Sequence, residues 1–597
     1  STAIGYAALE TQNFTSATDS LNTAVGYNAG TAVTTGVQNT IIGALAGDAL
    51  TTGSEHVVLG YGALTDATTA TGNVAIGHEA SANITTGSNN VSLGKLALYT
   101  LTTGGQNVSI GSQALRLLTS GSNNVGVGHT AGKAFTTGHS NVAVGFESLL
   151  TEDTGRKNVA VGFETLKVQN SDADNFNTAV GYQAGKAVTT GTLNTLIGGL
   201  AGDAITTGES NVAVGYLALS DTTTGGDNTA VGELALSNNT TAVRNTALGS
   251  SALFTNTTGA DNVAIGTGSL YANTTGANNV AVGKDALDSN TTASNNVAVG
   301  VDALQANVLG AESVAIGTFA LNAQNVSSAT SMYNVAVGHN TGAAVTTGIQ
   351  NTLIGALAGD SLTDADFNVA IGTASLASDT LGSRSVAIGR RTLMAQNFTS
   401  ATDTYNVAVG FEAGNDITTG DRNTLIGGLA GDALNTGAAN VAVGYLALSS
   451  DTKGSSNVAI GRGALQDQNF TTGTDSFNTA VGDRAGENVT TGLYNTLIGG
   501  LAGDALTDAD ENVAVGQSAL TTDTKGSRNV AVGQIALATQ NFTTSTNSYN
   551  TGVGYAAGSA VTTGIQNTLI GGLAGDALTD ADYNVALGYL ALSTDTL

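Results

Sequence analysis

The chain lacks proline, cysteine and tryptophan, and lysine and arginine together account for only 18 of its 597 residues. The absence of cysteine excludes disulfides, thiolate metal sites and cysteine nucleophiles. The absence of proline leaves nearly every backbone N–H free to join a hydrogen-bonded ladder. It also excludes collagen, which needs frequent proline beside its glycine, although 81 glycines are present. These absences indicate a backbone that is held together mainly by hydrogen bonds.

Basic residues are outnumbered by 45 aspartates and glutamates, which gives a formal net charge of −27. Such a surface repels phosphate backbones, so we expect no nucleic-acid partner. Charged residues make up only 11% of the chain, which is too few for a disordered polyanion. Because no run of about 18 apolar residues occurs, we also expect no membrane insertion.

One motif, Asn-Val-Ala-Val-Gly and its close variants, occurs 34 times between Ser1 and Gly588. Of the 33 intervals between its glycines, 27 are 17 residues long, five are 21 and one is 19. A unit of this length is too short for a helix pair or a propeller blade, but it suits two short strands and two turns. The sequence therefore predicts an all-β parallel β-solenoid, or β-roll, of about 34 coils. Residues 1–597 are expected to form a single repeat array without a separate globular domain.

The places of the motif are strict, and the first and fifth suggest distinct structural roles. The first place is Asn except at Ser1, His56, Ser313 and Ser385, and we expect the stacked amides to form a ladder between coils. The fifth place is always Gly, which predicts a corner with positive φ or close backbone contact. Representative positions are Asn22, Val25 and Gly26, Asn211, Val214 and Gly215, Leu425 and Gly427, and Leu497 and Gly499.

The second and fourth places are apolar or Thr, and alternation along a strand makes them share one face. We predict that this face, which includes Val25 and Val214, fills the core of the coil. The third place is mostly Ala, is never charged, and is sometimes Leu: Leu196, Leu353, Leu425, Leu497 and Leu569. We expect it to face outward and to pack against identical strands around an axis, in an intertwined or side-by-side homotrimer. A double-layered single chain is the alternative.

The rest of the coil predicts a second strand, built on Ala-Leu or Ala-Gly, followed by a Thr-Thr-Gly turn. In the Ala-Gly coils an aliphatic residue three places later, such as Val33 or Val188, is expected to fill the missing volume. From about residue 317 to 597 a super-repeat of 72 residues appears, with Gly338, Gly410 and Gly482 at matching places. Such copying predicts lengthening by duplication, which preserves a shaft better than an active site.

Candidate chemical sites are few, and we predict no enzyme activity, cofactor or bound metal. The five histidines do not occupy matching places in adjacent coils, and neither Gly-x-Ser-x-Gly nor a phosphate loop occurs. The pairs Asp364 and Asp366, Asp508 and Asp510, and Asp580 and Asp582 have the spacing of turn residues, with calcium ligation as the alternative. Aromatic residues after the corner glycine are expected to pack along a solvated edge, with sugar stacking as the alternative; they include Tyr27, Phe163, Tyr182, Tyr216, Tyr445 and Tyr589. Ice binding by the threonine-rich rows is a further alternative.

The motif resembles the head repeat of YadA-type trimeric autotransporter adhesins. The fuller pattern from Asn22 to Gly43, with Thr34-Thr-Gly between two copies of the motif, is similar to repeats of bacteriophage tail fibres. The adhesin resemblance implies a left-handed parallel β-roll made by three chains, although the 17-residue period departs from that family's shorter repeat.

The resulting hypothesis is a structural shaft or spacer of a phage tail fibre, located on the virion. It would join the rest of the fibre and the baseplate, and hold a tip that binds a host glycan or protein. A bacterial trimeric surface adhesin and a self-assembling extracellular filament are the alternatives. Because the chain starts at Ser1 without Met and ends in an apparent loop, we expect it to be a segment of a longer protein.

Overall fold

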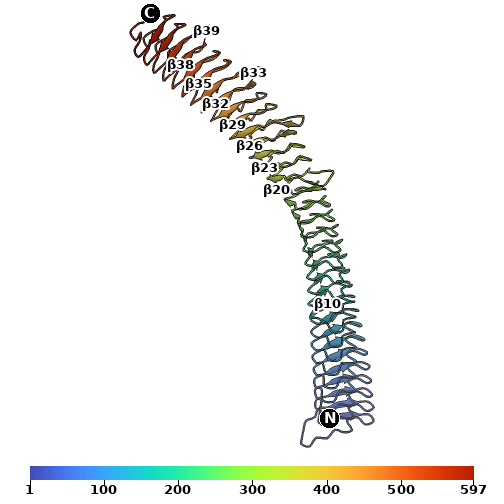
Figure 1. The fold of residues 1–597 in the computed structure, drawn as a ribbon. Helices are drawn as coiled ribbons and strands as arrows, with labels where there is room; N and C mark the ends of the chain where they lie inside the picture. The colour runs from blue at the N-terminus through green and yellow to red at the C-terminus, as the bar shows by residue number, and fades with distance from the viewer. Residues whose placement is uncertain (597) are drawn as a thin grey trace. The chain divides into compact units, whose positions relative to one another are not determined.

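The computed structural model describes residues 1–596, which divide into two units, residues 1–295 and residues 296–596. Each unit is a stack of coils whose three-residue strands form one parallel sheet (Figure 1). No helix occurs among residues 1–596. The predicted parallel β-solenoid of about 34 turns is therefore confirmed. The single array over residues 1–597 stays a prediction, and the two units are described separately.

In the first unit the sheet strands are β1 (Thr2–Ile4), β2 (Thr23–Val25), β3 (Thr40–Ile42), β4 (Val57–Leu59), β5 (Val74–Ile76), β6 (Val91–Leu93), β7 (Val108–Ile110), β8 (Val125–Val127), β9 (Val142–Val144), β10 (Val159–Val161), β11 (Thr178–Val180), β12 (Thr195–Ile197), β13 (Val212–Val214), β14 (Thr229–Val231), β15 (Thr246–Leu248), β16 (Val263–Ile265) and β17 (Val280–Val282).

In the second unit they are β18 (Val297–Val299), β20 (Val314–Ile316), β22 (Val335–Val337), β23 (Thr352–Ile354), β24 (Val369–Ile371), β26 (Val386–Ile388), β28 (Val407–Val409), β29 (Thr424–Ile426), β30 (Val441–Val443), β32 (Val458–Ile460), β34 (Thr479–Val481), β35 (Thr496–Ile498), β36 (Val513–Val515), β38 (Val530–Val532), β40 (Thr551–Val553), β41 (Thr568–Ile570) and β42 (Val585–Leu587). Two-residue strands at the longer coils are β19 (Gly310–Ala311), β21 (Thr330–Ser331), β25 (Gly382–Ser383), β27 (Thr402–Asp403), β31 (Gly454–Ser455), β33 (Thr474–Asp475), β37 (Gly526–Ser527) and β39 (Thr546–Asn547).

Register is the same from coil to coil, so each place of the motif forms a straight row along the stack. Val212 pairs with Thr229 and Val214 with Val231, and β13 and β14 run parallel. The longer coils keep this register by bulging elsewhere: β31 and β33 form a separate small sheet beside the main one. A longer coil therefore adds a loop without shifting the strand rows.

The corner glycines have positive φ, as predicted, and close contact with the next coil makes glycine obligatory there. Gly215 has a φ of 141°, and a Cβ on it would lie 2.4 Å from the carbonyl oxygen of Gly232. Gly26, Gly427 and Gly499 are in the same situation, each with a carbonyl oxygen 2.5 Å from the ideal Cβ position. No side chain fits in such a space, because backbone atoms rather than a flexible side chain occupy it.

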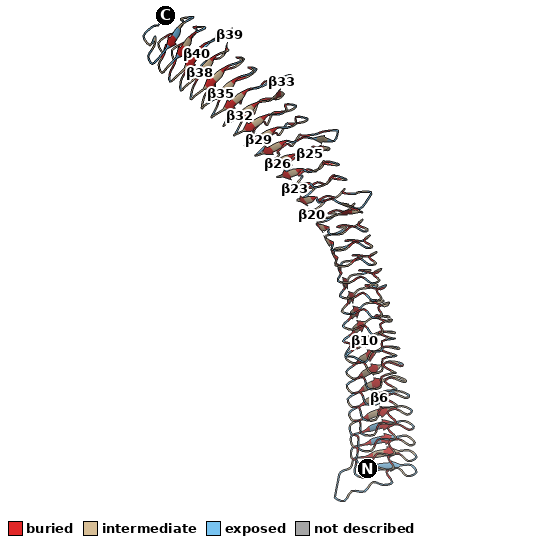
Figure 2. Cartoon of the chain, in the orientation of Figure 1, coloured by how far each residue is buried: buried red, intermediate tan, exposed pale blue. Residues whose placement is uncertain are grey.

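The two faces of the strand are the reverse of the prediction. The third place is fully buried, as at Ala213 and Leu425, so it points into the coil, whereas the second and fourth places are more exposed and face outward. Figure 2 colours the buried and the partly exposed residues along the strands. Val25 and Val214 accordingly lie half-buried on the outer face instead of in the core. The reason is steric: the narrow interior already holds the Leu of the opposite wall, so the strand contributes mostly Ala.

Leucine at the third place occurs where the opposite wall lacks a side chain. The Cδ atoms of Leu425 lie 2.7 and 2.9 Å from the ideal Cβ positions of Gly414 and Gly431, which belong to successive coils. Leu497 relates in the same way to Gly486 and Gly503. One leucine thus fills the space left by two glycines, so Leu425 and Leu497 are core residues and do not line an axis between chains. Val33 and Val188 are also buried beside Ala-Gly, as predicted.

The predicted second strand is wrong, because the Ala-Leu segment forms turns. Leu217 and Leu219 have φ values of 56° and 54°, in the left-handed region that non-glycine residues rarely adopt. The same conformation recurs in the other coils, and Leu219 is buried. Burial of the leucine, together with the hydrogen bond from its N–H to the Ala235 carbonyl at 3.0 Å, offsets the cost of this backbone.

Candidate functional site

The asparagine ladder is present, and it joins each coil to both of its neighbours. The side chain of Asn211 is fully buried, and its amide nitrogen donates to the Gly225 carbonyl at 2.9 Å. Its oxygen accepts the backbone N–H of Asn228 at 3.1 Å, while its own N–H donates to the side-chain oxygen of Asn194 at 3.0 Å. Asn22 makes the same contacts with Gly36 and Asn39. The ladder closes each coil and links it to the next.

His56 takes the place of asparagine in the ladder and reproduces its hydrogen bonds. Its Nδ1 accepts the backbone N–H of Asn73 at 3.1 Å, so the proton must be on Nε2, which donates to the Ala70 carbonyl at 2.8 Å. Burial lowers the pKa of this imidazole, because a charged ring would lose solvation and would turn a proton toward the Asn73 N–H. His56 is thus a structural residue held in its neutral form.

In the longer coils a glutamine that is tied to a buried acid joins the ladder, while the asparagine hydrogen bonds continue, as from the Asn478 N–H to Asn457 at 3.2 Å. Gln468 accepts the side-chain amide of Asn478 at 2.9 Å and donates to Asp451 at 2.7 Å. The other carboxylate oxygen of Asp451 accepts the N–H groups of Gly454 and Phe470 at 2.9 and 3.2 Å. The same pairing occurs at Asp379 with Gln396, Asp523 with Gln540, and Glu152 with Gln169.

Sequence reasoning missed this acid–glutamine pair. The signal was present, because each acid precedes its glutamine by 17 residues, the length of one coil. The glutamine stands at the start of the longer loop of its coil, yet Gln468 is fully buried. Phe470 of the same loop is also buried, which anchors the loop on the coil below it.

The outer face of the strands is apolar in both units. Its residues are Val or Thr at the second place and Val, Ile or Leu at the fourth, so no charged side chain occurs on it. Ile426 is 40% exposed and Ile498 is 39% exposed, and the same row continues through coil after coil. We call this surface the strand face. A long exposed apolar surface of this kind is typical of an interface with another chain.

No family model matches this chain, and no curated protein matches it either. The likeness of the motif to adhesin heads and to phage fibres therefore remains a prediction from the residues. What the structure adds is the fold and the identity of the exposed and buried faces.

Aromatic residues at the sixth place, directly after the corner glycine, stack on one another. The rings of Phe146 and Phe163 are 5.2 Å apart between centroids, and those of Phe163 and Tyr182 are 5.4 Å apart. Both pairs are nearly parallel, so these rings turn faces toward each other. Here the aromatic residues pack along the edge of the solenoid, as the sequence favoured.

Beside this stack, Glu164 is held by cations and an amide. Hydrogen bonds from Lys167, Lys186 and Gln183 lower the pKa of Glu164 to about 2. Its carboxylate therefore stays ionised down to strongly acidic pH.

The paired aspartates of the turns bind backbone groups of the preceding coil. Asp366 accepts the N–H of Ile349 at 2.8 Å, Asp510 that of Leu493 at 2.8 Å, and Asp582 that of Ile565 at 2.7 Å. These hydrogen bonds join neighbouring coils and are not local to one turn. Within residues 1–596, no group of three or more His, Asp or Glu side chains is placed to hold a metal. The same residues contain no helix long and apolar enough to cross a bilayer.

A further acidic row occupies the tenth place of the coils with the Ala-Gly-Asp sequence. Partial burial raises the pKa of Asp432 to about 6, and the neighbouring Asp416 and Glu412 add to the shift. One carboxylate oxygen of Asp432 is buried without a hydrogen-bond partner. Burial also raises the pKa of its equivalents Asp48, Asp203, Asp360 and Asp504. The ionised form of this row opposes folding at neutral pH.

Proposed function

We propose that this protein is a structural shaft or spacer, assembled as a homotrimer in the tail fibre of a virus. It would connect to the rest of the fibre and the virion baseplate and hold a tip that binds a host glycan or protein. The observation that carries the proposal is the strand face, which is apolar, uncharged and repeated at constant spacing. The resemblance of the motif to phage fibre repeats supplies the viral context.

The mechanical part of the proposal is supported by the continuity of hydrogen bonds along each unit. Neighbouring coils share the strand ladder, the asparagine ladder and a row of threonines, in which Thr189 donates to the Thr206 carbonyl and Thr206 to that of Thr223. Each unit contains 17 sheet strands, which at about 4.8 Å per strand corresponds to a length of about 80 Å. Load applied along such a stack is divided among several parallel ladders.

The assembly part of the proposal is supported by how well the strand face suits a second copy. Identical spacing of rows means that parallel copies match row for row along the whole contact. A net charge of −27 would drive identical chains apart, but the acids lie off the strand face. Burying rows of Val, Ile and Leu between copies would contribute about 25 cal/mol per Å² of apolar surface removed from water.

The test is the mass of the particle in solution, measured by sedimentation equilibrium on the parent chain and on two variants. Ile426→Lys with Ile498→Lys places charges on the strand face without touching the core. The matched control, Thr472→Lys, adds a lysine to an exposed loop residue. We expect a trimer for the parent and the control, and monomers for the double variant. A monomeric parent would overturn the homotrimer.

A bacterial trimeric adhesin and an extracellular filament remain alternative proposals, and the same experiment separates one of them. A filament would give a ladder of masses that grows with concentration, whereas the fibre and the adhesin both give a closed trimer. Detection of the intact chain in purified virions, by peptide mass spectrometry, would distinguish the fibre from the adhesin.

A further inference from the structure

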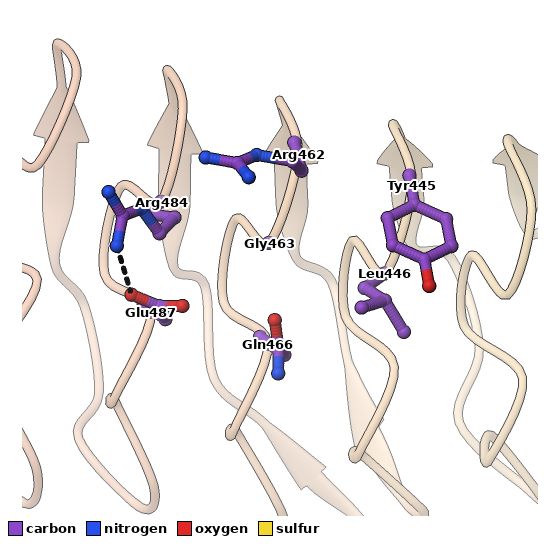
Figure 3. Close-up of a pocket in the computed structure, with 7 residues that line it drawn as sticks. All are labelled: Tyr445, Leu446, Arg462, Gly463, Gln466, Arg484 and Glu487. Carbon is purple, nitrogen blue, oxygen red and sulfur yellow. Dashed lines mark ion pairs between the residues drawn. The ribbon is translucent and has the colours of Figure 1, made fainter.

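A shallow pocket of about 90 Å³ opens on the second unit, between the edge formed by the sixth place and the wall opposite the strand (Figure 3). Tyr445 and Leu446 form one side, Arg484 and Glu487 form the other, and Gly463 lies between them. Three successive coils thus contribute to it. The volume accommodates one ring-sized group.

The pocket exists because one side chain of a regular row is missing. Gly463 occupies the seventh place, where the coils on either side carry Leu446 and Arg484. The backbone of all three is alike, with φ values of 62°, 58° and 53°. A Cβ on Gly463 would lie 3.1 Å from the side-chain oxygen of Gln466, so any larger residue would enter the pocket.

The sides of the pocket differ in chemistry. Tyr445 is 54% exposed and offers its ring, with the Leu446 side chain beside it. On the other side Arg484 is held loosely, 3.9 Å from Glu487 and 3.7 Å from Asp483. The 3.7 Å contact is made by Nε, which is buried and lies beyond hydrogen-bond distance of Asp483. The Arg484 side chain is 43% exposed, so its terminal nitrogens are the donors that a ligand can reach.

The remaining polar groups give the pocket donors and acceptors without a net charge. Arg462 makes a bidentate pair with Asp483, at 2.7 and 2.9 Å, which fixes its guanidinium at the rim. Gln466 offers both an amide donor and an oxygen acceptor. Two arginines are thus balanced by Asp483 and Glu487, and no excess positive charge is left to hold an anion.

We propose that this pocket binds a neutral pyranose ring of a saccharide. The apolar face of the sugar would lie on Tyr445 and Leu446, and its hydroxyls would accept from Arg484 and donate to Glu487. Hydroxyl groups both donate and accept, which suits a mixed set of amide, guanidinium and carboxylate groups. A carboxylated sugar is disfavoured by Glu487 and by the net charge of −27.

The site is independent of the proposed shaft function. The third place of the strand points inward toward the eighth and ninth places. A Cβ on Gly126, at the third place, would meet Leu115 at the ninth and Ala131 at the eighth. The seventh and tenth places flank these two, so they lie on the wall across the coil from the strand. Assembly through the strand face therefore leaves the Leu446, Arg484 and Glu487 part of the pocket uncovered, while Tyr445 and Arg462 lie at the edge between the two faces. A shallow single-ring site is expected to bind weakly, with a Kd of about 1 mM or more.

The experiment is saturation-transfer NMR on the full chain, with the methyl glycosides of glucose, galactose, mannose and N-acetylglucosamine as probes and glucuronate as the charged comparison. The decisive variant is Gly463→Leu, which fills the pocket with a residue that the neighbouring coil already carries in the same backbone conformation. The matched control is Gly268→Leu, at the same place of another coil. In that coil and its two neighbours the sixth place holds Thr267, Ser250 and Lys284, none of which is aromatic.

We expect at least one neutral glycoside to bind the parent and the control, and to bind Gly463→Leu about tenfold more weakly or not at all. Tyr445→Ala and Arg484→Met should weaken the same glycoside, while circular dichroism shows both variants folded. The proposal is overturned if none of the neutral glycosides binds the parent, or if Gly463→Leu binds as the parent does. It is equally overturned if glucuronate binds more tightly than every neutral probe.

Discussion

The asparagine ladder predicts that replacing Asn211 by Leu opens the solenoid locally. Leucine has a similar size but no polar group, so the Gly225 carbonyl and the Asn228 N–H both lose their partners at a fully buried position. Each buried group left without a hydrogen bond costs about 1–3 kcal/mol. The two together should destabilise the surrounding coils by about 2–6 kcal/mol.

A second variant separates loss of the hydrogen bonds from a mere change of shape. Asn211→His introduces the residue that already occupies the same place at His56, where both ring nitrogens satisfy the ladder. We expect this variant to retain most of the stability at pH 7.5 and to lose it when the pH falls well below 6.5. The direction of this pH dependence follows from His56, whose pKa is lowered in the folded state, so that protonation favours unfolding.

Hydrogen–deuterium exchange is the appropriate assay, because a solenoid opens coil by coil and a melting temperature averages over all coils. The amide of Asn228 and its neighbours should exchange about 30-fold faster or more in Asn211→Leu, as expected for 2 kcal/mol or more. Coils distant from residue 211 should exchange as in the parent. Unchanged exchange in Asn211→Leu, or faster exchange in Asn211→His at pH 7.5 than in Asn211→Leu, would refute the reasoning.

Three further predictions follow from the faces, the acidic row and the repeat. Leu425→Ala should lower the local stability of its coil by about 2–5 kcal/mol, measured by hydrogen exchange, because Leu425 is a core residue. Ile426→Ala should leave the core intact and weaken association between chains instead. Equal effects of the two substitutions would contradict the assignment of the strand faces. The pKa of Asp432 is raised from 3.8 to about 6, so its ionisation opposes folding. Lowering the pH from 7.5 to 4.5 should therefore stabilise the coils around Asp432 by about 1–2 kcal/mol after allowance for solvent screening. Asp432→Asn should abolish this stabilisation, and a stabilisation that survives the substitution would have to come from other groups. Deleting residues 339–410 removes one super-repeat of 72 residues. The second unit should then be about 19 Å shorter in electron micrographs, with an unchanged circular dichroism spectrum. Deleting ten residues inside the block should instead unfold it, and identical behaviour of the two deletions would contradict the coil assignment.

The sequence alone determined the period, the parallel strands, the glycine corners and the asparagine ladder. These features depend on spacing: residues 17 apart stack directly, so a strict place such as Asn211 or Gly215 must meet its own kind in the next coil. The close contact at Gly215 and the buried amide of Asn211 are consequences of that stacking. Local rules were sufficient because each coil contacts mainly its neighbours.

Only the tertiary structure decided which strand face is inside. Alternation says that Val214 and Ala213 point in opposite directions, but it does not say which direction is inward. The choice is made by the width of the coil, because the leucine of the facing wall leaves room for Ala and not for Val. A clue was present in the sequence, because the coil that has Leu425 at the third place has Gly431 at the ninth. A large side chain at one place, combined with no side chain at the other, indicates that the two places share the same interior space.

The backbone of the facing wall and the pocket were also beyond the sequence pattern. The Ala-Leu segment was predicted to form a strand, yet Leu219 adopts a left-handed conformation because a turn is needed to bring it into the interior. Gly463 is one glycine among many along the chain, and its significance depends on the side chains that neighbouring coils place around it. Packing between coils, which the order of residues does not display, decides both.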